Sequence, residues 1–309
     1  MSVFRHVALV GRTGSPHVVD SLRAVLAALQ TAGAEVTLES ATARMLGCSD
    51  GIARERIGEG VELVVVVGGD GSILGVARDV ADTGVPVLGV NRGGLGFLAD
   101  IAPNQIGGKV AAVLRGEHTV EDRFLLDARV YRDGEEVTVA TALNDVVVHA
   151  GSMSRMMDLR LAIDDEFVYD QRSDGLIVST PTGSTAYALS AGGPIMHPKL
   201  DAVVIVPMFP HTLASRPLVV HGSVRISVRF GGAAATPRVS CDSQVDQELE
   251  ANDEVRIAKH PHPLRLAFPV THNFYESCRS KLDWATRLGD RRDGPRLGDR
   301  EGAPRPGDA

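Results

Sequence analysis

The five residues from Gly68 to Ser72, with the sequence GGDGS, place one carboxylate among three glycines. Without Cβ atoms around Asp70, the backbone can take sharp or positive-φ geometry, and its N–H groups can approach a ligand closely. At the start of a helix, such a turn offers free N–H groups and a partial positive charge, which favour a phosphate. The sequence therefore predicts a phosphate-binding turn made of Gly68, Gly69, Gly71 and Ser72.

The simplest alternative for this turn is structural: a tight connection whose aspartate caps a helix. A structural turn does not require an aspartate between glycines, however, and no lysine lies nearby. Two familiar phosphate motifs are absent, because the sequence has no G-x-x-x-x-G-K-[ST] and no G-x-G-x-x-G after this strand. Apolar residues recur at helical spacing after Ser72, so this serine is expected to cap a helix.

Two further clusters could bind a ligand. The first is Asn144–Asp145, an amide and a carboxylate before an apolar strand, for which an Asx turn is the structural alternative. The second runs from Arg172 to Gly193 and concentrates small hydroxyl residues and glycines around Tyr187. Such a surface offers many short hydrogen-bonding groups and lets a planar base stack on the aromatic ring. The sequence predicts no serine nucleophile and no metal-ligand cluster, because it lacks G-x-S-x-G and its histidines lack metal-like spacing.

The elements that position these residues change character along the chain. Up to about residue 123, apolar strands alternate with amphipathic helices, and Val64–Val67 are four consecutive β-branched residues. This pattern predicts an α/β domain with a parallel sheet, whose ligands bind at the carboxyl ends of the strands. Both glycine-rich turns, at Gly68–Ser72 and Asn91–Phe97, fall on that edge. From Phe124 onward the apolar period is two, which predicts a β-rich second domain.

Composition restricts the class of protein. The chain has 309 residues, a formal net charge of −7 and a pI near 5.8, which argues against nucleic-acid or anionic-membrane partners. No apolar run approaches the roughly 20 residues of a membrane span, and the apolar stretch at the N-terminus is too short for a signal peptide. Cys48, Cys241 and Cys278 are odd in number and far apart, which favours a reducing compartment. The expected localisation is cytoplasmic.

Together these motifs resemble the NAD kinase family, from the first strand to about Trp284. The resemblance rests on GGDGS at Gly68–Ser72, NRGGLGFL at Asn91–Leu98, Asn144–Asp145, and SDGLIVSTPTGSTAYALSAGGPI at Ser173–Ile195. It implies transfer of the terminal phosphate of ATP to the 2′-hydroxyl of the adenosine ribose of NAD, giving NADP. Because the glycine turn has no lysine, Mg²⁺ is expected to arrive with ATP and neutralise the donor phosphates. It also implies an α/β N-terminal domain, a β-sandwich C-terminal domain, and a homodimer or homotetramer.

The domain boundaries expected on this basis are residues 1–123 for the α/β domain and 124–267 for the NAD-binding β domain. Residues 268–286 form a terminal segment that returns to the first domain. Residues 287–309 repeat the sequence RLGDR among Gly, Pro and Asp, without apolar periodicity, and are predicted to be disordered.

The resemblance also implies roles for individual residues. Asp70 is the general base on the 2′-hydroxyl, Asn144 lies near the adenine, and Asp145, where the family has Glu or Asp, lies near a ribose. Arg172 and Asp174 contact the nicotinamide side. The implied NAD- and nucleotide-binding residues are Gly71, Asn144, Asp145, Arg155, Arg172, Asp174, Thr185, Ala186, Tyr187, Ala188, Leu189, Ser190 and Gln244. Because many members carry Thr or Asn where this chain has Ser72, ATP and polyphosphate both stay open as donors.

Two other functions remain open at this point. Lipid kinases and 6-phosphofructokinases share the GGDG turn but not the segment Thr180–Gly193. A non-catalytic NAD or NADP sensor would use the same pocket without turnover, since fold alone does not determine function.

Overall fold

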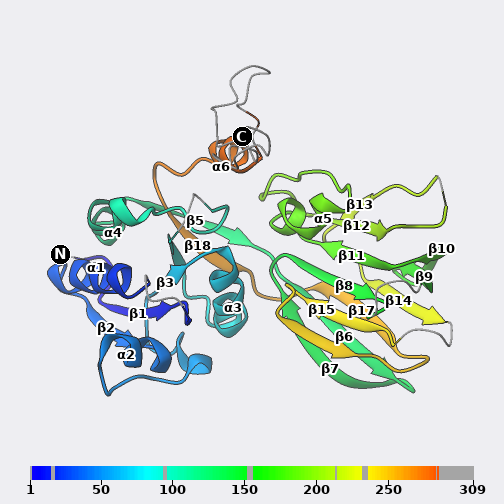
Figure 1. Cartoon of the computed structure of the whole chain (residues 1–309), viewed down its shortest axis with the longest axis horizontal. Coiled ribbons are helices and arrows are strands. Elements are labelled where there is room, and N and C mark those ends of the chain that lie inside the picture. The colour runs from blue at the N-terminus through cyan, green and yellow to red at the C-terminus, as the bar shows by residue number, and fades with distance from the viewer. Residues whose placement is uncertain are drawn as a thin grey trace, which may run out of the picture. The chain divides into compact units, whose positions relative to one another are not determined.

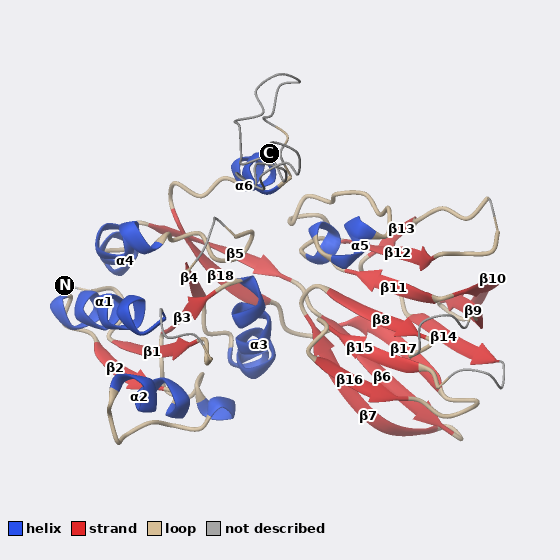
Figure 2. Cartoon of the chain, viewed as in Figure 1, coloured by secondary structure: helices blue, strands red, loops and turns tan. Residues whose placement is uncertain are grey.

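The computed structural model describes residues 2–14, 18–92, 96–151, 156–212, 214–231, 236–282 and 284. These residues fall into two compact units, one up to His272 and one from Asn273 onward. Helices gather in the N-terminal part of the first unit, and its C-terminal part consists mainly of strands (Figure 2).

Figure 1 labels the elements. The helices are α1 (Val18–Thr31), α2 (Ser40–Leu46), α3 (Asp70–Val80), α4 (Ile106–Leu114), α5 (Tyr187–Ser190) and α6 (Phe274–Lys281), with a 3-10 turn η4 (Gly183–Thr185). The strands of the N-terminal part are β1 (His6–Gly11), β2 (Glu35–Leu38), β3 (Leu63–Gly68), β4 (Val87–Asn91) and β5 (His118–Arg123). The remaining strands are β6 (Leu126–Arg132), β7 (Glu135–Ala142), β8 (Asp145–His149), β9 (Met157–Ile163), β10 (Glu166–Ser173), β11 (Gly175–Ser179), β12 (Ala202–Met208), β13 (Leu218–His221), β14 (Ile226–Gly231), β15 (Arg238–Cys241), β16 (Val245–Glu248), β17 (Glu254–Lys259) and β18 (Leu264–Pro269).

The α/β domain is built on a mixed sheet with the strand order β2-β1-β3-β4-β18-β5. All pairs are parallel except β18 with β5. Every residue of β3 is buried, because α1 and α4 pack on one face of the sheet and α3 packs on the other. The parallel α/β domain predicted from the apolar runs is confirmed.

The second domain is a sandwich of two antiparallel sheets, β10-β9-β14-β17-β6-β7 and β13-β12-β11-β8-β15-β16. One hydrophobic core joins the facing sides of these two sheets. A smaller core lies on the other face of the second sheet, where Ala188 and Met196 pack against Val147 and Ile177. Strands β8 and β11 are therefore buried on both faces, which explains their continuous apolar sequences.

Hairpin turns agree with the sequence in two places. Asp133 and Gly134 between β6 and β7 both have positive φ, as do Asp164 and Asp165 between β9 and β10. Positive φ at both central residues matches the twist of the flanking strands, and Asp and Gly tolerate it. Strands β5, β10, β11, β15 and β16 were not predicted, because their sequences are polar or lie within the presumed binding clusters.

Three details differ from expectation. The expected boundary after residue 267 falls inside β18, which pairs with β4 and β5, so the chain re-enters the mixed sheet at Leu264. Helix α3 begins at Asp70 with Gly69 as N-cap and no side-chain cap, so the prediction that Ser72 caps it is wrong. The glycines of the GGDG turn do not use positive φ.

The terminal segment is described only in part. In the second unit, helix α6 begins after Asn273, whose side chain accepts hydrogen bonds from the backbone N–H groups of Tyr275 and Glu276. The predicted disordered tail, residues 287–309, lies outside the described residues.

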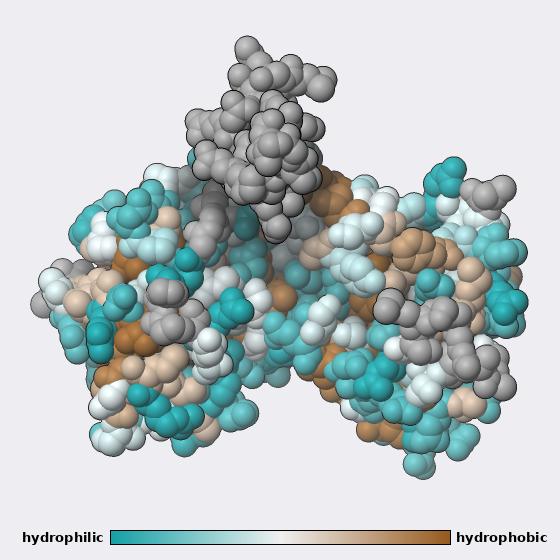
Figure 3. All heavy atoms as spheres, in the orientation of Figure 1, coloured by the Kyte–Doolittle hydropathy of each residue, from teal (hydrophilic) through white to brown (hydrophobic). Residues whose placement is uncertain are grey.

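Within the described ranges, no helix is long and apolar enough to cross a membrane. On the face viewed in Figure 3, hydrophilic side chains divide the exposed hydrophobic ones into small patches. Such scattered exposure is ordinary for a protein surface.

Candidate active site

Asp70 is the first residue of α3 and lies at the carboxyl end of β3. Its Oδ2 accepts a hydrogen bond from the backbone N–H of Phe97 at 2.9 Å. Its Oδ1 accepts from Leu98 at 3.2 Å and from Ala99 at 3.1 Å. The side chain therefore joins the two glycine-rich turns, which follow neighbouring strands of the mixed sheet.

The glycines around Asp70 provide space. A Cβ on Gly96 would lie 2.2 Å from Oδ1 of Asp70 and 3.0 Å from the Ala99 carbonyl oxygen. A Cβ on Gly68 would lie 2.2 Å from the Ser72 Oγ. Close approach of backbone to side chain, and not an unusual φ, is what these positions require.

The first turn of α3 leaves donors for an anion. Among the described residues, the backbone N–H groups of Asp70 and Gly71 have no hydrogen-bond partner, whereas that of Ser72 donates to the Gly69 carbonyl oxygen at 2.9 Å. Gly71 is exposed, and Gly69, Asp70 and Ser72 are partly buried. Free N–H groups at a helix N-terminus suit a phosphate oxygen.

The backbone of Leu143–Asp145, which we call the acceptor turn, is held on both sides. Its N–H groups donate to the Asp242 carboxylate, at 3.0 Å from Leu143, 2.7 Å from Asn144 and 3.3 Å from Asp145. The Thr180 hydroxyl donates to the Leu143 carbonyl oxygen at 2.6 Å, and the Thr180 backbone N–H donates to the Asn144 carbonyl oxygen at 2.9 Å. The acceptor turn is therefore a rigid platform.

The side chains of Asn144 and Asp145 project from this platform without a hydrogen-bond or ion-pair partner among the described residues. Asp145 is only 2% exposed. Burial, and then the negative charge of Asp242, raises the pKa of Asp145 to about 7. Asp145 is buried and its carboxyl group has no partner among the described residues, so this side chain and the partly buried Asn144 beside it are candidate ligand-binding groups.

Burial also raises the pKa of Asp242, but three backbone N–H groups and the Arg78 guanidinium act in the opposite direction. No such donor favours the charged form of Asp145. When this pair of carboxyl groups takes up a proton, it therefore resides on Asp145, and Asp242 stays ionised.

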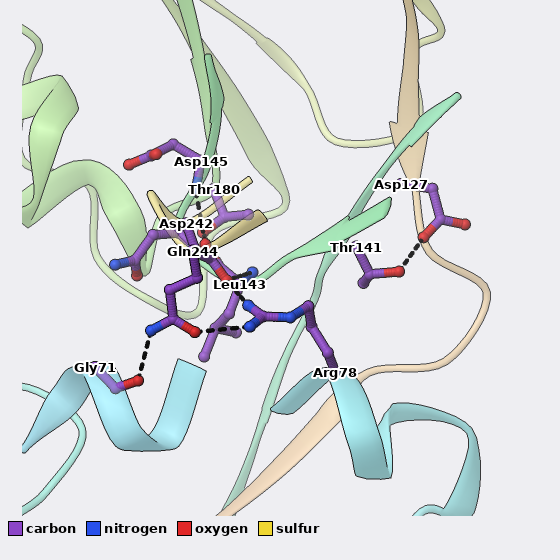
Figure 4. Close-up of polar contacts among 10 residues, drawn as sticks. Gly71, Arg78, Asp127, Thr141, Leu143, Asp145, Thr180, Asp242 and Gln244 are labelled. Carbon is purple, nitrogen blue, oxygen red and sulfur yellow. Dashed lines mark hydrogen bonds and ion pairs between the residues drawn. The ribbon is translucent and has the colours of Figure 1, made fainter. Parts of the chain in front are cut away.

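The two domains meet at Gln244. Its Nε2 donates to the Gly71 carbonyl oxygen at 2.7 Å, and its Oε1 accepts from Nη2 of Arg78 at 2.7 Å (Figure 4). Nη1 of Arg78 lies 3.4 Å from Oδ2 of Asp242. A continuous chain of polar contacts thus runs from the phosphate-binding turn to the acceptor turn.

The segment from Thr185 to Ser190 begins beside the acceptor turn. A Cβ on Gly183 would lie 2.1 Å from the Asn144 carbonyl oxygen, so η4 packs directly on this turn. Tyr187 starts α5 and is 42% exposed, which leaves its ring available for stacking. Ala188, by contrast, is fully buried in the core under the second sandwich sheet.

Arg172 and Asp174 lie away from the acceptor turn. In the pairing of β11 with β8, Gly175 is opposite His149 and Ser179 is opposite Asp145. Asp174 precedes Gly175, so it lies at the opposite end of these strands from the acceptor turn, about 17 Å away by strand rise. The structure does not bring this pair into the cluster around Asn144. Arg155 lies outside the described residues.

Sequence reasoning missed four contributors to the site: Arg78, Gly96, Thr180 and Asp242. Thr180 lies within the stretch Arg172–Gly193 that the sequence had already indicated, Gly96 lies in the second glycine-rich turn, and Asp242 is two residues before Gln244. Arg78 had no signal, because an arginine near the end of an amphipathic helix is ordinary.

A turn with free N–H groups on an α/β domain, connected through Gln244, Arg78 and Asp242 to unpartnered polar side chains on a β sandwich, fits the class of two-domain kinases. Comparison with known proteins narrows this class. The model of the ATP-NAD kinase N-terminal domain matches residues 7–118, and that of the ATP-NAD kinase C-terminal domain matches residues 143–267. The chain belongs to the ATP-NAD kinase family, and its function is that of an NAD kinase.

Individual relatives agree. The NAD kinase of Marinobacter nauticus is 52% identical over 93% of this chain and 99% of its own length. That of Hahella chejuensis is 53% identical over 93% of this chain and 98% of its own length. The crystal structure of yeast NADH kinase complexed with NADH has a TM-score of 0.84 at 24% identity, covering 92% of this chain and 89% of that one, and supports the fold. An Archaeoglobus fulgidus NAD kinase in complex with ATP has a TM-score of 0.70 at 26% identity, covering 89% and 99%.

Replacing Gly96 tests whether the position of the Asp70 carboxylate matters. Gly96→Ala adds a methyl group that Oδ1 of Asp70 must avoid, so we expect kcat to fall by about tenfold to 100-fold through misplacement alone. Gly108→Ala on α4, where a Cβ meets nothing within 4 Å, is the matched control and should leave kcat unchanged. Equal kcat values for both variants and the wild type would contradict this role.

Proposed function

We propose that the protein transfers the terminal phosphate of ATP to the 2′-hydroxyl of the adenosine ribose of NAD, giving NADP. The observation that carries this proposal is the chain of contacts from Gly71 through the side chains of Gln244, Arg78 and Asp242 to the acceptor turn. It connects a phosphate-type turn to unpartnered amide and carboxyl side chains. The proposal is also supported by NAD kinases whose sequences are near 50% identical to this one over almost the whole chain.

Asp70 is the group that receives the hydroxyl proton. A carboxylate has about four acceptor positions, and three N–H groups occupy three of them, which leaves one on Oδ2 for the hydroxyl. Because phosphoryl transfer passes through a loose transition state, the proton can move late and positioning matters more than basicity. The free N–H groups of Asp70 and Gly71 favour the negative donor phosphates.

Asn144, Asp145 and Tyr187 hold the acceptor. A ribose hydroxyl that donates to Asp145 would satisfy its buried carboxylate, and the adenine can stack on the exposed Tyr187 ring. Arg172 and Asp174 remain candidates for the nicotinamide side, since a dinucleotide is long enough to reach beyond one subsite.

Mg²⁺ is proposed to arrive with the nucleotide. Among the described residues, no group of three or more His, Cys, Asp or Glu side chains is arranged to hold a metal. The phosphates themselves would therefore supply its main ligands, and the ion would neutralise charge on the transferred group. ATP is the proposed donor, as in the Archaeoglobus fulgidus complex, with polyphosphate as the alternative.

We further propose a cytoplasmic homodimer or homotetramer that does not bind nucleic acid. All three cysteines are free, which suits a reducing compartment. The net charge of −7 opposes binding to polyanions.

The direct test uses purified protein, Mg·ATP and NAD, with product measured by an NADP-specific dehydrogenase. We expect NADP to accumulate. NAD binding without product would favour a sensor, and absence of NAD binding would favour a kinase for another acceptor. Replacing ATP by polyphosphate in the same assay identifies the donor.

Asp70→Asn should lower kcat by about 100-fold or more, the usual range for a general base. NAD affinity, measured by calorimetry, should change little because the proposed NAD groups lie on the sandwich. Asp165→Asn removes a carboxylate whose side chain is 95% exposed and should behave as the wild type. Near-normal turnover of Asp70→Asn would refute the assignment.

The pH dependence of NAD use should follow Asp145. With a pKa of about 7, this carboxyl group is mostly protonated below pH 7 and mostly ionised above it. Since the ionised form is the better acceptor for a ribose hydroxyl, kcat/KM for NAD should rise about tenfold from pH 6 to pH 8. In Asp145→Asn this rise of kcat/KM with pH should disappear. A pH profile unchanged by the substitution would exclude Asp145 as the origin of the rise.

A further inference from the structure

Three neighbouring strands of the mixed sheet, β3, β4 and β18, are parallel and end at one edge. Asp70 follows β3. The backbone segment Phe97–Ala99, which donates three hydrogen bonds to the Asp70 carboxylate, lies in the connection that follows β4. His272 lies shortly after β18. The order of these strands in the sheet therefore places His272 beside the segment that holds the base.

Asp100 joins this segment to His272. Its Oδ2 lies 3.2 Å from Nδ1 of His272, and the two side chains are only 9% and 8% exposed. Because an ionised carboxylate can only accept hydrogen bonds, Nδ1 is the nitrogen that carries the proton in this contact. Asp100 directly follows Ala99, whose N–H donates to Oδ1 of Asp70 at 3.1 Å. The contact is therefore one residue away from a donor to the base.

His272 is itself fixed to the sheet. Its ring stacks on that of Phe268, with the ring centroids 3.9 Å apart and the planes 14° from parallel. Phe268 is 1% exposed and belongs to β18, which pairs with β4 and β5. The His272 N–H also donates to the Pro269 carbonyl oxygen at 2.9 Å. The histidine thus presents its Nδ1 proton to Asp100 from a defined position.

The other contacts of this connection close it on itself. The Ile101 carbonyl oxygen accepts from the Asn91 N–H at 2.8 Å, and the Ala99 carbonyl oxygen accepts from the Gly96 N–H at 3.1 Å. By contrast, the Asp100 side chain ties the connection to another strand, through its contact with His272. A buried carboxylate that loses its partner can regain hydration only by moving, and its backbone adjoins Ala99.

We infer that His272 is a positioning residue, which acts through Asp100 to hold the segment Phe97–Ala99 and, with it, the carboxylate of Asp70. This inference rests on the proposed function and deepens it. The three N–H groups leave one acceptor position of the carboxylate for the ribose hydroxyl, so a shift of these donors turns that position away. A misplacement of about 1 Å can cost about 100-fold in rate.

The test uses two variants that separate the donor from the ring. His272→Phe keeps a ring to stack on Phe268 and removes Nδ1, so we expect kcat to fall by about tenfold or more, with KM for NAD and for ATP within about twofold of the wild type. His272→Asn loses the ring but keeps an N–H donor near the position of Nδ1, and it should retain more of kcat than His272→Phe. The reverse order of the two variants would overturn the inference.

His118→Phe is the matched control. The His118 ring lies 5.2 Å from that of Phe4, and its buried Nδ1 has no hydrogen-bond partner among the described residues. The same substitution there should leave kcat unchanged. Asp100→Asn is a milder change that keeps an acceptor oxygen and weakens the contact, because the hydrogen bond is no longer charge-assisted. We expect kcat to fall by about threefold in this variant, and an unchanged kcat would count against the inference.

An Asp70→Asn background separates positioning from general damage. Once the base is removed, the residual rate does not depend on where its carboxylate points. Adding His272→Phe to Asp70→Asn should therefore change kcat by less than about twofold. Multiplicative losses in this double variant would overturn the inference, and so would a raised KM with unchanged kcat in His272→Phe alone.

Hydrogen exchange tests the structural dependence without turnover. In His272→Phe, amide exchange should become at least about tenfold faster at Phe97, Leu98 and Ala99, whereas exchange in β6 of the sandwich should not change. Absence of NADP formation by the wild-type protein would refute the proposed function alone. Unchanged exchange at Phe97–Ala99 would refute the dependence on His272, and faster exchange confined to this segment would support it.

Discussion

The site depends on the contacts of one buried group, the ionised carboxylate of Asp242. It can stay charged because three backbone N–H groups and one guanidinium surround it. The N–H groups belong to the acceptor turn and the guanidinium belongs to α3, so one side chain connects the two surfaces that must cooperate. The neighbouring Asp145 experiences this charge and has no hydrogen-bond donor of its own among the described residues.

Close packing of backbone is the second recurring constraint. Gly68, Gly96 and Gly183 each lie where an added Cβ would approach another atom to 2.2 Å or less. The first two surround Asp70 and Ser72, and the third brings η4 onto the acceptor turn. At each of these three positions the glycine is needed for the close approach of neighbouring atoms.

Much of this architecture could be predicted from local sequence. The four valines of β3 required burial on both faces, the alternation after Phe124 required antiparallel strands, and the three motifs indicated the kinase family. The polar contacts that organise the site could not be predicted in the same way, because Asn144 and Asp242 are 98 residues apart and no periodicity relates them. Likewise, the glycines of the GGDG turn suggested positive φ, whereas none of them has it, and Gly68 is needed because an added Cβ would lie 2.2 Å from the Ser72 Oγ. Such a close approach depends on neighbours in three dimensions.

The sandwich begins and ends at one place in the mixed sheet. The chain leaves this sheet after Arg123 of β5 and re-enters it at Leu264 of β18, and these two residues are direct partners in the antiparallel pair. The β sandwich is therefore an insertion domain with adjacent termini, attached through two neighbouring connections. A domain with this geometry is suited to separate production or circular permutation. Isolated in this way, it would retain Asn144, Asp145 and Tyr187 on one polypeptide, apart from the helix that carries Asp70.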